Sequence, residues 1–190
     1  EDMKQGNREN LRDKAGNFLE LFTVLSVGFV LLASEVYRYV YVSRDFWGST
    51  MLIPIFVSSY YTNFLCTFPV NFEYYHKKTK VVSIITIVSS LINVGLNYLL
   101  ILRIGMAGAA VATLISHSLQ LTLHHLYVRF ALGGKEYPFP LKMWVGYAAV
   151  FAAVAVASVA ADGLWLARWG LGAAVGLWEL LRIRKRKVLI

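Results

Sequence analysis

The sequence predicts an all-α integral membrane protein with about six transmembrane helices. Of its 190 residues, 57% are hydrophobic and only 16% are charged, whereas an ordinary soluble domain carries about 25% charged residues. Mean hydropathy is +0.55. The net charge of +8 comes from basic residues at the ends of apolar runs, so it indicates membrane flanks and no nucleic-acid partner.

Six apolar stretches are candidates for crossing a bilayer, which takes about 20 residues. They are residues 16–42, 49–73, 79–102, 107–131, 142–161 and 164–181. Arg103 lies in the turn after the third stretch. Arg168 lies in the sixth, where we expect it to extend to the membrane interface between Trp165 and Trp169.

The stretches divide the chain into five parts. These are an N-terminal segment at 1–15, four helices at 16–131, a loop at 132–141, two further helices at 142–181 and a basic tail at 182–190. The fifth and sixth stretches carry almost no polar stripe, so we expect the last two helices to be peripheral.

The basic residues predict the orientation. Six spans place both termini on one side, and fifteen of the nineteen lysines and arginines fall on that side. The other four are Arg38, Arg44, Arg103 and Arg168. Because lysine and arginine collect in cytoplasmic loops, both ends of the chain are predicted to be cytoplasmic.

Three consecutive spans each carry a polar stripe at helical spacing. The stripes are Asn63, Thr67 and Asn71; Ser89, Asn93 and Asn97; and Thr113, His117, Gln120 and His124. Lipid offers no hydrogen-bond partner, so these side chains should face protein or water. They either bond helix to helix or line a hydrated cavity for a polar substrate.

Small residues follow the third turn. Gly108, Ala112 and Ser116 are four apart and predict a face where a neighbouring helix backbone approaches closely. Near the end of the first span, Arg38 pairs locally with Glu35 or, with Arg44, lines the mouth of a cavity.

No enzyme, metal or cofactor site is predicted. Cys66 is the single cysteine, and the histidines lack carboxylate or cysteine partners at metal-ligand spacing. No serine or cysteine is arranged with them as a nucleophile.

The basic turn "HKKTK", the paired Asn93 and Asn97, the short "RIG" turn and the following "GAAVAT" form a recognisable series. Residues 18–130 resemble the C-terminal part of polysaccharide and oligosaccharide flippases, in the multidrug/oligosaccharidyl-lipid/polysaccharide exporter superfamily. The last two spans resemble these flippases only in hydropathy. The chain opens at Glu1 with mostly hydrophilic residues, and we expect it to be the C-terminal part of a longer protein.

The resemblance implies a two-lobed bundle that flips an undecaprenyl-diphosphate-linked oligosaccharide across the bacterial inner membrane by alternating access. The implied partners are this lipid-linked sugar, membrane lipids and the missing N-terminal lobe. It also favours the cavity interpretation, so the predicted substrate-binding residues are Asn63, Asn93, Asn97, His117, Arg38 and Arg44.

Two alternatives stay open. A cation-coupled multidrug exporter of the same superfamily would carry carboxylates at mid-membrane, and none is obvious in the sequence. A non-transporting membrane assembly module is also consistent with the chain. A membrane enzyme has His76 as its only candidate, and His76 lies in a basic turn.

Overall fold

The computed structural model describes residues 8–37, 44–134, 137–139, 141–160 and 164–186. Within these ranges the chain is helical and contains no strand. Its α-helices are α1 (Arg8–Val36), α2 (Ile53–Tyr75), α3 (Thr79–Ile104), α4 (Met106–Phe130), α5 (Leu141–Ala160) and α6 (Trp165–Arg186). A 3₁₀ helix, η2 (Arg44–Leu52), precedes α2. The all-α prediction is confirmed for the described residues.

Helix boundaries differ from the predicted spans mainly at polar ends. The helix α1 begins at Arg8, inside the predicted hydrophilic segment, and α6 continues to Arg186, inside the predicted basic tail. Helical hydrogen bonding tolerates charged side chains, so a helix extends beyond its apolar part. The prediction that Arg103 lies in a turn is wrong, because Arg103 lies exposed in the last turn of α3 and the turn itself is at Gly105.

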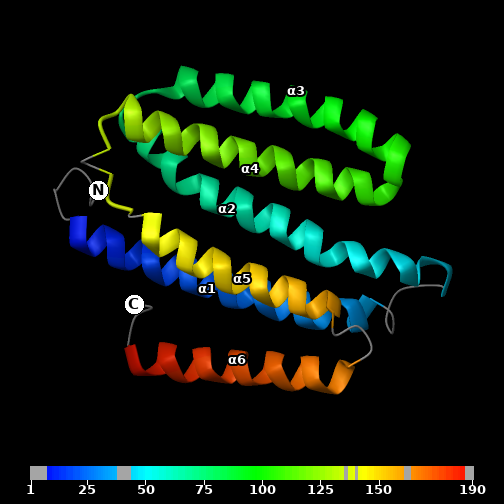
Figure 1. The fold of residues 1–190 in the computed structure, drawn as a ribbon. Helices are drawn as coiled ribbons and strands as arrows, with labels where there is room; N and C mark the ends of the chain where they lie inside the picture. Colours follow the sequence, from blue (N-terminus) through cyan, green and yellow to red (C-terminus); the bar gives the residue numbers. More distant parts are fainter. Residues whose placement is uncertain (1–7, 38–43, 135–136, 140, 161–163, 187–190) are drawn as a thin grey trace. The chain divides into compact units, whose positions relative to one another are not determined.

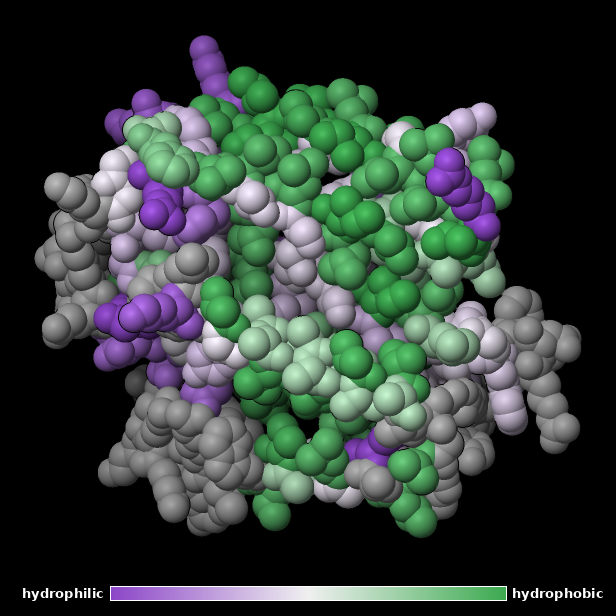
Figure 2. All heavy atoms as spheres, viewed as in Figure 1, coloured by the Kyte–Doolittle hydropathy of each residue, from purple (hydrophilic) through white to green (hydrophobic). Residues whose placement is uncertain are grey.

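Four segments of the described residues are long and apolar enough to cross a membrane. They are Asn10–Ser34, Trp47–Tyr75, Thr79–Ile104 and Met106–Phe130. The apolar part of α5, Trp144–Ala160, is shorter. Apolar side chains cover much of the visible surface, and the most hydrophilic ones lie near helix ends (Figure 2). The fifth and sixth spans remain predictions.

The chain forms two compact units. The first unit contains Glu1–Arg12 and Ser58–Trp144, and the second contains Asp13–Val57 and Val145–Ile190. In the first, α2, α3 and α4 lie side by side (Figure 1). The second unit contains most of α1, the helix η2, most of α5 and α6.

Tight turns join α2, α3 and α4. At the end of α2, the Lys77 N–H donates to Tyr74 O and the Lys78 N–H to Glu73 O, both at 2.9 Å. This is a Schellman motif with Lys77 in the left-handed region, at φ 58°. Gly105 is the single residue that connects α3 to α4, and its backbone has φ 60° and ψ −141°. That conformation is readily available only to glycine.

Candidate functional site

The helices α3 and α4 pack through the small-residue face of α4. A Cβ added at Gly108 would collide with the Leu100 carbonyl group and lie 2.7 Å from the Ile101 nitrogen. Ala112 is fully buried and Ser116 is 4% exposed. The predicted close approach of a neighbouring helix is therefore confirmed, and the neighbour is α3.

The predicted amides Asn93 and Asn97 form a short chain of hydrogen bonds. Asn97 Nδ2 donates to Asn93 Oδ1 at 2.9 Å, and Asn93 Nδ2 donates to Ser116 Oγ at 3.2 Å. Ser116 Oγ in turn donates to Ala112 O at 2.8 Å. These amides thus link α3 to α4, while both remain partly exposed.

His117 links α4 to α2. Its Nδ1 lies 2.9 Å from Ser59 O, and because a carbonyl oxygen only accepts, Nδ1 is the protonated nitrogen in this contact. The Tyr60 ring lies nearby, with ring centroids 6.4 Å apart. Asn93 and His117 therefore both make contacts between helices.

Asn63 is in a different environment. It belongs to an exposed stripe along α2, which consists of Tyr60, Asn63, Thr67, Asn71 and Tyr74. Thr67 Oγ1 donates to Phe64 O in its own helix at 2.7 Å. Within the described part of the chain, the amides of Asn63 and Asn71 have no hydrogen-bond partner. Unlike Asn93 and His117, Asn63 therefore makes no contact between helices through its amide, and this amide faces the surroundings of the helix.

The two predicted arginines cannot be placed at the site. Arg38 lies outside the described residues, and Arg44 is the first residue of η2, with no description of its side chain. Their mouth-lining role stays a prediction.

The sequence interpretation missed a buried acid–base pair between α2 and α4. Glu73 and His124 are both fully buried, and His124 Nδ1 lies 2.8 Å from Glu73 Oε1. Spacing had placed His124 in the polar stripe of α4. Glu73 lies 51 positions away, at the end of a span beside a basic turn, and no local pattern connects it with His124. An acidic residue in an apolar helix was the only available signal.

Aromatic rings surround this region. Phe68, Phe72, His125, Tyr137, Phe139 and Trp144 are in ring contact, with centroid distances of 5.1 to 6.3 Å. Tyr137 and Phe139 of the predicted loop, together with Trp144 of α5, therefore pack against α2 and α4. Burial, with smaller effects of Cys66 and Glu73, raises the pKa of the Tyr137 hydroxyl above its ordinary value.

In the second unit, the expectation for Arg168 is wrong. Arg168 is 4% exposed, and its Nη2 donates to Val30 O at 3.3 Å. The guanidinium group carries five donors, so it is stable in the interior when backbone carbonyls accept from it. It thus joins α6 to α1, and α6 is not merely peripheral.

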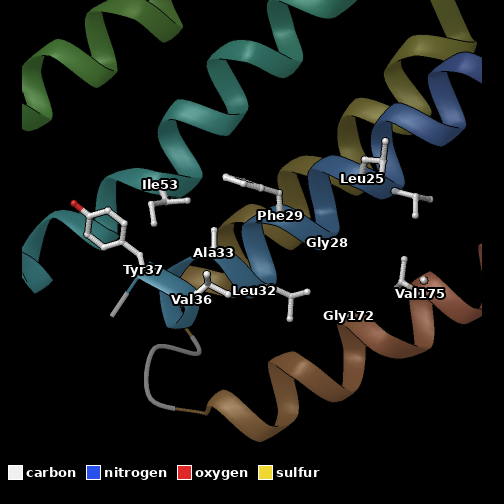
Figure 3. A pocket seen from close by; sticks show the side chains of 12 residues that line it. Leu25, Gly28, Phe29, Leu32, Ala33, Val36, Tyr37, Ile53, Gly172 and Val175 are labelled. Atoms are coloured by element: carbon white, nitrogen blue, oxygen red, sulfur yellow. The ribbon is translucent and has the colours of Figure 1, made fainter. Parts of the chain in front are cut away.

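An apolar groove of about 650 Å³ also lies in the second unit (Figure 3). Its lining comes from α1, α6 and the first turn of α2, and includes Leu25, Gly28, Phe29, Ile53, Gly172 and Gly176. A Cβ at Gly28 or Gly176 would meet no atom within 4 Å. The absence of side chains at these glycines leaves the groove wide, and its apolar walls suit an aliphatic chain.

No group of three or more histidine, cysteine or acidic side chains in the described part of the chain is placed to hold a metal ion. Comparison with protein-family models, with curated proteins and with solved structures gave no match.

Proposed function

We propose that this chain is the C-terminal part of a flippase that moves an undecaprenyl-diphosphate-linked oligosaccharide across the bacterial inner membrane by alternating access. The resemblance of residues 18–130 to such flippases motivates the proposal. In this proposal the chain catalyses no chemical reaction and requires no cofactor. Its partners are the lipid-linked sugar, membrane lipids and an N-terminal lobe of the same protein.

One structural observation supports the proposal most strongly, namely the exposed polar stripe of α2. The segment Trp47–Tyr75 is long and apolar enough to cross a membrane, yet Asn63 and Asn71 are exposed on it. An unbonded amide in hydrocarbon costs several kcal/mol, on the order of 4 to 8. Such a face is stable only against water or a polar partner, as in a hydrated path for a sugar headgroup.

The amides Asn93 and Asn97 and the imidazole of His117 border the same three-helix unit. They bond within the bundle but remain partly exposed. In this proposal they act both as links between helices and as donors along the path. The apolar groove of the second unit supplies a surface for the isoprenoid chain of the substrate.

The test is transfer of a fluorescent lipid-linked oligosaccharide across proteoliposomes by the full-length protein. Asn63→Leu and Asn71→Leu remove exposed amides, so transfer should fall at least tenfold while folded yield stays unchanged. The control Val156→Leu changes an apolar side chain of α5 that is 71% exposed and does not belong to the stripe. Unchanged transfer in both asparagine variants would contradict the proposal.

A second candidate is the cation-coupled multidrug exporter. Glu73 favours it, because this acidic side chain near the end of α2 is fully buried, and buried acidic residues within membrane helices commonly belong to ion or proton pathways. This candidate predicts extrusion of a lipophilic cationic dye that is lost in Glu73→Gln. Absence of both sugar transfer and dye extrusion in the unmodified full-length protein would leave the assembly module as the function.

A further inference from the structure

Four helical segments of the second unit each contribute one buried polar side chain to a small pocket of about 30 Å³. These side chains are 3 to 4% exposed, and they belong to Ser34 of α1, Thr50 of η2, Ser158 of α5 and Arg168 of α6. The other lining residues, Met51, Pro54 and Val159, are apolar. Buried polar groups are stable only when each finds a hydrogen-bond partner, so the bonds of these four groups need to be accounted for.

The hydroxyl group of Ser34 has no hydrogen-bond partner within the described residues. A serine inside a helix can donate to the carbonyl four residues earlier, as Ser116 does to Ala112 O. For Ser34 this carbonyl is Val30 O, which accepts the backbone N–H of Ser34 in the helix and Arg168 Nη2 at 3.3 Å. Both lone pairs of Val30 O are thereby used, so the Ser34 hydroxyl is left to bond within the pocket.

The hydroxyl groups of Thr50 and Ser158 offer only lone pairs to the pocket. Thr50 Oγ1 donates its proton to Trp47 O at 2.7 Å, and Ser158 Oγ donates to Ala155 O at 2.8 Å. Each hydroxyl has a single proton, so both oxygens can only accept from an occupant. The guanidinium group of Arg168 has the opposite character, because it carries donors and no acceptor. An occupant that satisfies this lining must both donate and accept hydrogen bonds.

We propose that the pocket binds one water molecule, which connects α1, η2, α5 and α6. The water accepts from Arg168 and from the Ser34 hydroxyl, and it donates its two protons to Thr50 Oγ1 and Ser158 Oγ. Buried waters make two to four such bonds and need a cavity of at least about 10 to 15 Å³. The volume of about 30 Å³ is therefore sufficient, and it is far below the roughly 300 Å³ of the smallest typical ligand pockets.

A chloride ion is the competing occupant, because Arg168 is a cation. A chloride ion only accepts hydrogen bonds, however, and it would lie against the lone pairs of Thr50 and Ser158 with no proton between them. A metal cation would be repelled by the guanidinium group in the same pocket. The water site belongs to the chain itself and does not depend on what the chain transports.

The first experiment is water-edited solid-state NMR of the chain in liposomes, with ¹³C-labelled threonine. Thr23 of α1 is the matched control for Thr50, because it is also buried and donates to a carbonyl of its own helix, Leu19 O, but does not line the pocket. Magnetisation should pass from water to Thr50 about threefold or more faster than to Thr23. Thr50→Val and Thr23→Val assign the two signals. Equal rates in the unmodified chain would overturn the proposal.

The variant Ser34→Val distinguishes a bound water from water at the membrane surface. Valine replaces the hydroxyl by a methyl group and adds a second one, so it fills the pocket and removes one partner of the water. Because Ser34 is buried, the outer surface of the chain stays the same. Transfer to Thr50 should fall to the level of Thr23, whereas Ser26→Val, at a buried serine of α1 outside the pocket, should leave it unchanged. Undiminished transfer to Thr50 in folded Ser34→Val would contradict the proposal.

The second experiment separates water from chloride and needs no variant for its main result. It measures the thermal midpoint of the unmodified chain in detergent, with chloride replaced by gluconate at constant ionic strength. A ligand that binds only the folded chain raises stability with its concentration, so a water site predicts the same midpoint in both salts. A midpoint that rises with chloride in the unmodified chain and not in Ser34→Val would assign the pocket to an anion and overturn the proposal.

Discussion

Gly108 of α4 lies against the backbone of Leu100 in α3, so closely that any side chain at this position would collide with the carbonyl group. Gly108→Leu should therefore overpack the contact and lower the free energy of unfolding by at least about 1 to 3 kcal/mol. Ala153→Leu, at an exposed position of α5, should be nearly neutral. Folded yield and thermal midpoint in detergent measure both effects, and equal losses would show that the Gly108 contact is not essential.

The bond between Asn93 and Ser116 should contribute a small coupling energy. Hydrogen bonds between membrane helices average about 0.6 kcal/mol, so Asn93→Ala and Ser116→Ala should show about that coupling in a double-mutant cycle. Pairing Asn93→Ala with Thr122→Ala, an exposed residue of α4, provides the uncoupled control. A coupling energy of zero between Asn93 and Ser116 would show that their hydrogen bond does not stabilise the packing of α3 against α4.

A transfer assay can distinguish a packing role of Asn93, Asn97 and His117 from a role in transport. If Asn93, Asn97 and His117 also line the sugar path, their alanine variants should reduce transfer by more than their loss of stability explains. The measurement is transfer per folded molecule in proteoliposomes. Transfer that falls only in proportion to folded protein would mean that these side chains are packing groups alone.

Arg168 should be important for stability although it lies in the last helix. Its guanidinium is buried and bonds to Val30 O, and hydrogen bonds to charged groups contribute about 1.5 to 3 kcal/mol. Arg168→Ala should lower the free energy of unfolding by about that amount. Arg103→Ala, at the exposed end of α3, should change it by less than about 0.5 kcal/mol, and a larger loss for Arg103 would contradict the assignment.

Filling the apolar groove tests whether it holds an aliphatic chain. Gly176→Leu adds a side chain where a Cβ meets open space. Folding should therefore be unaffected, and the leucine side chain should fill the groove. Crosslinking to a photoactivatable isoprenyl phosphate should then fall at least fivefold. Gly170→Leu, an exposed position of the same helix with open space around it, should leave crosslinking unchanged.

Much of the fold followed from periodicity and from small residues. Apolar length predicted the helices, and the four-residue spacing of Gly108, Ala112 and Ser116 predicted the buried face of α4 without any knowledge of its neighbour. Glycine and alanine have few other reasons to recur at that spacing among leucines and isoleucines, so local sequence was sufficient.

The candidate site was less predictable, because its contacts join residues distant in sequence. Glu73 reaches His124 across 51 positions, and Arg168 reaches Val30 across 138. A charged residue near a helix end has the same local pattern whether it extends to the interface or enters the interior. Only the packing of the neighbouring helix distinguishes these outcomes, which is why Arg168 was predicted at the membrane interface and no role was predicted for Glu73.

The single-residue connection at Gly105 also bears on how the chain is made. The helix α3 ends at Ile104 and α4 begins at Met106, so one residue holds the two helices close together. The contact between Gly108 and Leu100 can therefore form once the first turns of α4 have formed. We therefore expect α3 and α4 of a membrane-embedded chain to enter the bilayer together, as one hairpin. An insertion of several flexible residues after Gly105 should allow the two helices to enter separately.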